Sequence, residues 1–423
     1  SSARDPPTYY AGLARKTVKE SPNDFIHLVV ERCEIDTVEI KDVYLSVYKK
    51  KLADDILENY NGVLQRILLG LLDEPWEKLA KEAPQVESSP GQAEESKSPK
   101  MKTIEKPLYH GTIKPALAFD PKDSAEKLKK AMKGFGTDEK TIVQVLSSKS
   151  NEQRRTIYNT YQQEFKKDLI DELKSELGGD MENLVVAMLL PSDVFYAREL
   201  DKAMKGFGTN EEALCEIICA QSSESLEAVV NCYKREKGKD LSAAIDGETK
   251  DDVQRLLLGL LLSGRLNAKE VDMNEVEAAA LDISKAQGNR WQGENSVIQN
   301  LLGTKSRDFM AEVITEFQKI TKSDIIEMIN KETSGTYKDC LLAAVECIRH
   351  PPTYFAKRLH NALDRMNVDD DTLIRCLVGR SEIDLLEVKQ SYQALASMSL
   401  ADMVKKKCRG EYETLLVALI DGN

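Results

Sequence analysis

The sequence predicts an all-α protein built from tandem repeats, and three observations support this prediction. Apolar residues recur at helical spacing along most of the chain, as in Ala125, Leu128 and Ala131. No segment shows a convincing alternation of apolar and polar residues, the pattern of a half-buried strand. The motif Met-Lys-Gly-Phe-Gly-Thr occupies residues 132–137 and recurs 72 residues later at 204–209. We therefore expect repeating units of about five short helices each.

The chain divides into segments in the following order. Residues 5–73 form a first unit, because Pro6-Pro7-Thr8-Tyr9-Tyr10 resembles Pro351-Pro352-Thr353-Tyr354-Phe355 far downstream. Residues 74–119 are expected to form a flexible linker and an entry segment, and the linker is indicated by the stretch from Pro84 to Lys102, which is rich in Ser, Glu, Pro and Lys. The helical pattern then repeats in four segments, which are 120–191, 192–263, 275–347 and 351–423.

Composition limits the classes of function. The net charge of −12 argues against a dedicated nucleic-acid binder, which would present basic patches. The eight cysteines form no CxxC pair, so we expect small buried side chains and a reducing, cytoplasmic setting. No apolar run approaches the roughly 20 residues that span a bilayer. The N-terminal residues lack the apolar segment of a secretory signal.

Each glycine turn is paired with a distant acid. Glu176 follows Gly134 by 42 residues, and Glu248 follows Gly206 by 42 residues. A single glycine after a helix is usually a helix cap, but a turn and an acid that recur at one spacing suggest one site built twice. A phosphate loop is only weakly indicated, because the turn follows a helix and lacks the lysine in register.

Calcium accounts for more of this pattern. Ca²⁺ prefers oxygen ligands, often backbone carbonyls together with one bidentate carboxylate. Two glycines at i and i+2 let carbonyls turn towards one point, and water or a lipid phosphate would complete the coordination. Phe135 and Phe207, at the tips of the turns, would enter a lipid interface. Lys133 and Lys205 would attract anionic headgroups.

At these residues the chain resembles the annexin family. The family's calcium loop reads M-K-G-x-G-T, with an acid about 42 residues further on. The resemblance covers repeats four to eight of an eight-repeat annexin, and Tyr109 to Pro115 resembles the entry segment of the second lobe. It implies a curved core of four repeats, plus one extra repeat across the linker. The ligands that it implies are the carbonyls and carboxylates of Met132, Gly134, Gly136, Glu176, Met204, Gly206, Gly208 and Glu248.

The other repeats depart from the motif. The repeat 275–347 keeps an acid, Glu332, but has an altered turn around Trp291, so Glu332 is a weaker candidate ligand. Trp291 matches a family tryptophan that moves towards the membrane, and the alternative is a buried ring. In 351–423 the acid position, 42 residues after Arg365, is Lys407, which would repel a cation. In 5–73 the acid position falls near Asn59, so we expect no site there.

The main hypothesis is calcium-dependent binding to anionic phospholipid membranes by a cytoplasmic, peripheral protein without catalysis. Such a protein would link membranes to each other or to the cytoskeleton. The alternative is a helical scaffold that recognises protein partners and has incidental calcium sites. An enzyme is disfavoured, because the four histidines lie in different elements and no catalytic constellation is apparent.

Overall fold

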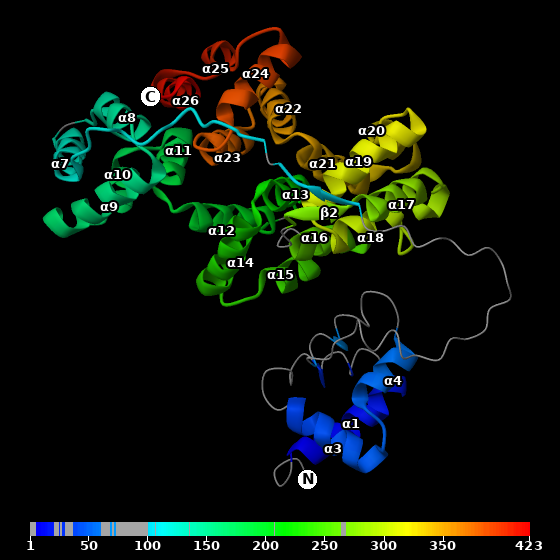
Figure 1. Cartoon of the computed structure of the whole chain (residues 1–423). Coiled ribbons are helices and arrows are strands. Elements are labelled where there is room, and N and C mark those ends of the chain that lie inside the picture. The colour runs from blue at the N-terminus through cyan, green and yellow to red at the C-terminus, as the bar shows by residue number, and fades with distance from the viewer. Residues whose placement is uncertain are drawn as a thin grey trace. The chain divides into compact units, whose positions relative to one another are not determined.

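The structure is a computed structural model of the chain. It describes residues 6–20, 25, 28–29, 37–60, 68–69, 72, 100–105, 107–134, 136–206, 208–263 and 268–423. The chain divides into two compact units, Ser1–Glu95 and Ser96–Asn423 (Figure 1). Most of the predicted linker, Cys33, Phe135 and Phe207 lie outside the described residues. None of the described helices is long and apolar enough to cross a membrane.

The described part of the first unit contains three full helices, α1 (Pro6–Glu20), α3 (Thr37–Tyr48) and α4 (Leu52–Asn59). Helix α1 packs on α3 and α4 around a small apolar core. Asp55 is fully buried in this unit and accepts hydrogen bonds from Arg15, Tyr44 and Lys50. Burial would raise the pKa of Asp55, but the bonds from its three partners lower it.

The second unit contains four groups of five α-helices, which confirms the all-α repeat prediction. The first two groups follow each other without a break. The first comprises α7 (Pro121–Ala131), α8 (Glu139–Ser147), α9 (Asn151–Phe165), α10 (Leu169–Glu176) and α11 (Gly179–Leu189). The second comprises α12 (Ser192–Ala203), α13 (Glu211–Ala220), α14 (Ser223–Lys237), α15 (Leu241–Glu248) and α16 (Asp251–Ser263).

The last two groups follow a short strand. The third comprises α17 (Met273–Ser284), the 3₁₀ turn η1 (Gly288–Arg290), α18 (Val297–Thr304), α19 (Arg307–Thr321), α20 (Ile325–Glu332) and α21 (Gly335–Arg349). The fourth comprises α22 (Pro351–Asp364), α23 (Asp370–Arg380), α24 (Leu385–Ala396), α25 (Leu400–Lys407) and α26 (Gly410–Asp421).

One local device fixes the position of the fourth helix in every group. The third helix ends at a residue in the left-handed conformation, which turns the chain sharply. These residues are Lys166, Gly238, Lys322 and Ser397, with φ of 54°, 66°, 60° and 54°. An eight-residue helix then begins within three residues, and its last residue is Glu176, Glu248, Glu332 or Lys407. The helix ends therefore coincide with the acid positions that the spacing predicts.

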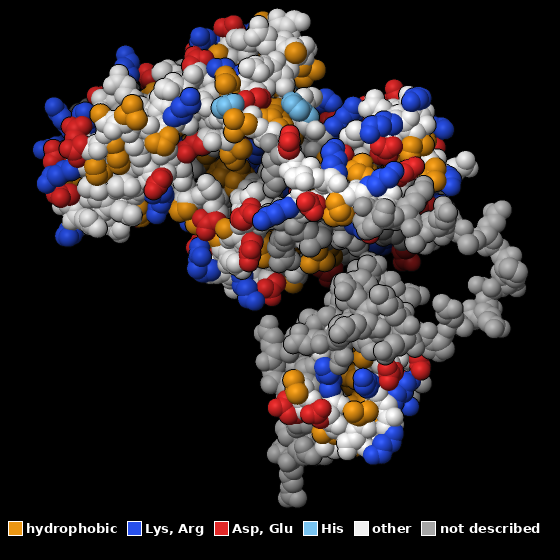
Figure 2. All heavy atoms as spheres, viewed as in Figure 1, with side chains coloured by type: hydrophobic (Ala, Val, Ile, Leu, Met, Phe, Trp, Pro, Cys, Tyr) orange, Lys and Arg blue, Asp and Glu red, His pale blue; other side chains and the backbone are white. Residues whose placement is uncertain are grey.

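The groups pack in pairs. Helices α8 and α11 of the first group contact α26 and α23 of the fourth, while α13 and α16 of the second contact α21 and α18 of the third. Gly259 of α16 and Gly303 of α18 let these two helices approach closely, since a Cβ on Gly259 would lie 2.9 Å from the Cα of Gly303. On the face that Figure 2 shows, acidic and basic side chains are interspersed over this unit.

A buried ion cluster joins the second group to the fourth. The carboxylate of Glu216 accepts bonds from Arg358 at 2.8 Å and from Arg375 at 2.7 Å. Burial would raise the pKa of Glu216, but these two guanidinium groups hold it below its ordinary value. A buried carboxylate with two partners is costly to leave unpaired, so the cluster specifies how α13 meets α22 and α23.

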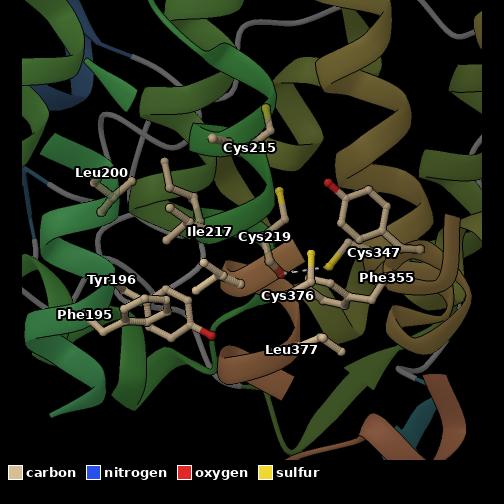
Figure 3. Close-up of a cluster of buried hydrophobic side chains, with 14 of the residues drawn as sticks. Phe195, Tyr196, Leu200, Cys215, Ile217, Cys219, Cys347, Phe355, Cys376 and Leu377 are labelled. Carbon is tan, nitrogen blue, oxygen red and sulfur yellow. Dashed lines mark hydrogen bonds between the residues drawn. The ribbon is translucent and has the colours of Figure 1, made fainter. Parts of the chain in front are cut away.

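The described cysteines are buried, as the sequence suggested. Figure 3 shows Cys215 and Cys219 of α13, Cys347 of α21 and Cys376 of α23 among apolar side chains such as Tyr196 and Phe355. The thiol of Cys347 donates to the carbonyl of Cys219 at 3.3 Å. Burial raises the pKa of Cys347 to about 11, so its thiol is a packing group and not a nucleophile.

Two short strands depart from the purely helical expectation. Strand β1 (Met101–Thr103) pairs antiparallel with β2 (Glu270–Asp272). Strand β1 overlaps the end of the Ser/Glu/Pro/Lys-rich stretch, so Lys100 to Lys102 are held by this pairing and are not part of a flexible linker. The segment beyond β1 is also held: the carbonyl of His110 accepts from Leu386, and Thr112 donates to the carbonyl of Leu419 at 2.6 Å. Three-residue strands are too short to show alternation, which is why the sequence gave no signal.

Candidate calcium sites

The two glycine turns have the same backbone. In the first, the amide of Asp138 donates to the carbonyl of Ala131 at 2.9 Å, and in the second Asn210 donates to Ala203 at 2.8 Å. Asp138 and Asn210 then accept from the first turn of the following helix as N-caps. In each turn, a backbone hydrogen bond joins residues that are seven positions apart. The residues between them form a loop whose carbonyls can point outward.

The glycines of the turns adopt conformations that other residues avoid. Their φ values are 117° for Gly134, 88° for Gly136, 101° for Gly206 and 91° for Gly208. A Cβ built at any of them would meet nothing within 4 Å. Glycine is therefore required by the backbone conformation and not by packing.

Among the described residues, the carbonyls of these turns have no protein donor. Within the described residues, nothing donates a hydrogen bond to the carbonyls of Gly134, Gly136, Gly206 or Gly208, and all four glycines are exposed. No described group donates to the carbonyls of Met132 and Met204 either, although Met132 is half-buried and Met204 is buried at the end of its helix. Exposed carbonyls without a protein donor are suited to coordinate a cation.

The acids lie against the turns. The hydroxyl of Thr137 donates to the carboxylate of Glu176 at 2.7 Å, which fixes the end of α10 beside the first turn. In the second repeat Thr209 donates to the backbone carbonyl of Glu248 at 3.0 Å, so the end of α15 lies beside the second turn, although this bond involves the backbone of Glu248 and not its carboxylate. The structure thus brings together the turn and the acid that the sequence paired over 42 residues.

The donor set fits a hard cation. Each candidate site combines carbonyls with one carboxylate, the mixture that Ca²⁺ accepts at roughly 2.3–2.6 Å. Among the residues that the structure describes, no three His, Cys, Asp or Glu side chains gather into a group that could hold a metal. The carbonyls of the turns are thus the main protein ligands on offer at these positions.

The third repeat differs at its turn. The carboxylate of Glu332 accepts from the amide of Gly288 at 3.3 Å, so the acid meets the start of η1. Trp291 is a buried ring whose indole nitrogen donates to the carbonyl of Ala286 at 3.0 Å, which is the alternative that the sequence left open. The amide of Gly293 donates to Asp252 at 2.8 Å. Sequence reasoning missed Asp252, because no local pattern marks a contact between neighbouring repeats.

In the fourth repeat a cation occupies the acid position. The amide of Asp369 donates to Ala362 at 3.1 Å, so this turn has the same length as the first. Arg365 stands where the first turn has Gly134, but its φ is −66°. The ammonium of Lys407 donates to the carbonyl of Arg365 at 3.0 Å. A protein cation thus contacts the carbonyl equivalent to that of Gly134.

In the first unit the equivalent helix α4 ends at Asn59. The Asn59 amide donates to the carbonyl of Asp55 at 2.7 Å, one turn earlier in the same helix. It carries no charge and is engaged within α4. The turn that would face it lies among residues that the structure does not describe.

Comparison with known proteins agrees with the repeat pattern. The annexin family model matches residues 8–71, 123–188, 195–260, 280–344 and 354–419. Annexin A4 of Canis lupus familiaris is 36% identical over 313 residues, which are 74% of this chain and 98% of that protein. The structure of annexin III aligns with a TM-score of 0.71 at 36% identity, over 75% of this chain and 98% of that one.

A second solved structure, calcium-bound annexin (Sm)1, aligns with a TM-score of 0.67 at 28% identity, over 74% of this chain and 93% of that one. The family match therefore extends over all five repeats and over both units. From these matches and from the shared fold, we conclude that this chain belongs to the annexin family.

Proposed function

We propose that this chain binds anionic phospholipid membranes in a calcium-dependent manner. The supporting observation is that, in the described residues of the repeats 120–191 and 192–263, turn carbonyls without a protein donor lie beside the helix end that carries Glu176 or Glu248. Membership of the annexin family and the calcium-bound relative support the same function. The proposed role is binding without catalysis, by a protein that attaches peripherally to the cytoplasmic side of a membrane when calcium rises.

Eight residues form the two proposed sites. The carbonyls of Met132, Gly134 and Gly136 with the carboxylate of Glu176 hold one ion. Met204, Gly206, Gly208 and Glu248 hold the other in the same way. Glu332 is a weaker candidate, because the amide of Gly288 already bonds its carboxylate and competes with an ion.

Lipid completes the coordination in this proposal. Sites with few charged ligands bind Ca²⁺ with Kd values of about 10⁻⁴–10⁻³ M. Phosphate oxygens of a lipid add ligands and charge, so calcium affinity rises at a membrane. The protein has a net charge of −12, so an anionic membrane would repel it, and bound Ca²⁺ would offset this repulsion.

The two units allow a further role in linking a membrane to a second membrane or to the cytoskeleton. The proposed calcium sites are in Ser96–Asn423, while the acid position of the first unit is Asn59. We therefore infer that the first unit contributes a contact that needs no calcium ion of this kind.

Carboxylate removal tests the proposal. In Glu176→Gln/Glu248→Gln, each site loses its charged ligand, and we expect the calcium concentration for half-maximal vesicle binding to rise by roughly tenfold or more. The measurement is co-sedimentation with phosphatidylserine vesicles over a calcium titration. Glu164→Gln/Glu236→Gln is the matched control, since these acids lie in the last turns of α9 and α14 and are related by the same 72-residue shift. Equal calcium requirements for wild type and the first variant would refute the proposal.

A further inference from the structure

We propose that the fourth core repeat contacts anionic lipid without calcium, through a cationic turn site formed by Arg365, Met366, Lys405, Lys406 and Lys407. The inference rests on the proposed function in one respect, because it takes the turn equivalent to residues 132–137 as facing the membrane. It goes beyond that function, because the ion is replaced by protein cations.

The first step is the replacement itself. Helix α25 ends at Lys407, as α10 ends at Glu176, and the Lys407 ammonium bonds the carbonyl of Arg365 at 3.0 Å. In the first repeat the corresponding carbonyl, that of Gly134, has no described donor. The fourth repeat therefore has a positive charge in the position where the first repeat requires Ca²⁺ to supply one.

The second step is the charge around this position. Lys405 and Lys406 are exposed in the last turn of α25, and within the described residues neither forms an ion pair. Arg365 is 59% exposed and has one ion-pair partner, Asp369, at 3.4 Å. Acidic residues Asp364, Glu411 and Glu413 also lie nearby in sequence. The local charge is therefore mixed, and the cations concentrate at the end of α25.

Arg409 does not add to the exposed charge in the same way. Its guanidinium donates to the carbonyls of Lys405, Lys406 and Cys408 at 3.1, 2.9 and 2.6 Å. These bonds satisfy the last carbonyls of α25, which otherwise attract the basic side chains of that turn. The ammonium groups of Lys405 and Lys406 are left to face solvent.

The third step is the tip of the turn. Met366 is 98% exposed and occupies the position of Phe135 and Phe207 in the other turns. A fully exposed Met that follows Arg365 gains nothing in water, whereas at a bilayer its thioether enters the interface while the basic side chains meet the headgroups. This combination favours a lipid surface over a soluble polyanion, which offers no apolar phase.

Charge and salt dependence follow from this arrangement. Each lysine near an anionic membrane strengthens binding by a factor of about five, and the effect falls off within about 10 Å at 0.1 M salt. We expect weak binding of the full chain to phosphatidylserine vesicles in the presence of a calcium chelator. That binding should disappear at high salt and on phosphatidylcholine vesicles.

Neutralising the two exposed lysines tests the proposal. Lys405→Gln/Lys406→Gln should lower the vesicle partition coefficient in chelator by roughly 25-fold. The control is Lys319→Gln/Lys322→Gln, which removes two exposed lysines at the end of α19, near the opposite end of α20 from Glu332; of the two, Lys319 pairs with Glu316 at 2.8 Å. Met366→Ser should weaken vesicle binding severalfold and leave binding to inorganic polyphosphate unchanged.

The outcomes separate this site from the calcium sites. Both proposals are supported if Lys405→Gln/Lys406→Gln still binds vesicles in calcium but no longer binds them in the presence of a chelator. If wild type in chelator binds phosphatidylserine no better than phosphatidylcholine, or if both lysine variants bind alike, the cationic turn site is refuted. An equal loss of vesicle and polyphosphate binding in Met366→Ser would overturn the bilayer as its partner. Failure of the calcium titration of Glu176→Gln/Glu248→Gln would refute only the proposed function.

Discussion

The repeats 120–191 and 351–423 share an arrangement of helices and a turn of the same length, but their turns differ in backbone conformation and in side-chain chemistry. Helices α10 and α25 are both eight residues long and both end beside a turn closed by a bond over seven residues. One ends in Glu176 next to positive-φ glycines, and the other ends in Lys407 next to Arg365. The helical scaffold therefore does not determine the ligand. Three positions differ: Gly134, Gly136 and Glu176 in the first repeat correspond to Arg365, Asn367 and Lys407 in the fourth. These three residues determine whether the turn is suited to a metal ion or is neutralised by a protein cation.

A second difference lies one turn earlier in the same helices. In the first repeat Glu172 accepts bonds from Tyr161, Lys129 and Lys167. In the fourth repeat Met403 takes the place of Glu172, and the buried hydroxyl of Tyr392 has no partner among the described groups. The first unit keeps the equivalent cluster of Tyr44, Arg15, Lys50 and Asp55 although its acid position is Asn59. Stabilising clusters and metal ligands thus vary independently.

Copying the fourth repeat into the first two should produce the largest effect. In Glu176→Lys/Glu248→Lys, each ammonium faces the carbonyls of its turn and repels Ca²⁺, so we expect calcium-dependent vesicle binding to fall by roughly 100-fold or more. Circular dichroism should show unchanged helicity, since both residues are exposed at helix ends. Retained calcium dependence in this variant would mean that the ions bind elsewhere.

The reverse exchange should create a site. In Arg365→Gly/Asn367→Gly/Lys407→Glu, the turn regains both glycines and the carboxylate, and we expect about one additional lipid-dependent Ca²⁺ per chain. Equilibrium dialysis with short-chain phosphatidylserine measures the stoichiometry. Lys407→Glu alone is the control, and it should add no ion, because Arg365 at φ −66° directs its carbonyl differently from Gly134. An additional ion with Lys407→Glu alone would show that the glycines are dispensable.

A smaller effect should follow from the glycines alone. Gly134→Ala meets no atom within 4 Å, so its cost is the strain of positive φ, about 1–2 kcal/mol. If calcium binding requires this conformation, the calcium midpoint should rise by a factor of roughly 5–30. Gly178→Ala is the matched control, because Gly178 has φ −145° and equally open surroundings. Equal midpoints for the two variants would contradict a role for the turn's backbone.

The smallest predicted effect is a pH dependence of stability that comes from Glu172. The fourth repeat has Met403 at this position and therefore lacks this contribution. Burial opposes ionisation of Glu172, but its bonds from Lys129, Lys167 and Tyr161 outweigh burial and lower its pKa from 4.5 to about 2. A lowered folded-state pKa stabilises the protein above pH 4.5, and this contribution is lost as the pH falls towards 2. Urea unfolding should show the stability difference between wild type and Glu172→Gln shrinking over this range. A constant difference would exclude ionisation of Glu172 as its cause.

Much of the fold could be predicted because it depends on local patterns. Helical periodicity and the recurring motif identified the repeats before any contact was known. The 42-residue spacing selected Glu176, Glu248 and Lys407, and the structure places each at the last residue of an eight-residue helix. Strands β1 and β2 were missed, since three residues are too few for a periodic signal.

The candidate sites depended more on contacts between distant residues. The sequence indicated that Lys407 would repel an ion, but not that its ammonium bonds the carbonyl of Arg365. It left open whether Trp291 is buried, and it gave no sign that Asp252 contacts the turn of the next repeat. These contacts depend on how α16 and α25 lie against neighbouring turns, which no local pattern encodes.

The sequence by itself thus determined the helices, the repeat period and the charge at each acid position. Those properties follow from residue type and spacing along a regular helix. Only the tertiary structure decided which turn carbonyls lack a described hydrogen-bond donor, and that the Lys407 ammonium bonds the carbonyl of Arg365. The reason is that hydrogen bonds across 39 to 44 residues, such as those of Thr137 with Glu176 and of Gly288 with Glu332, form only once the helices pack.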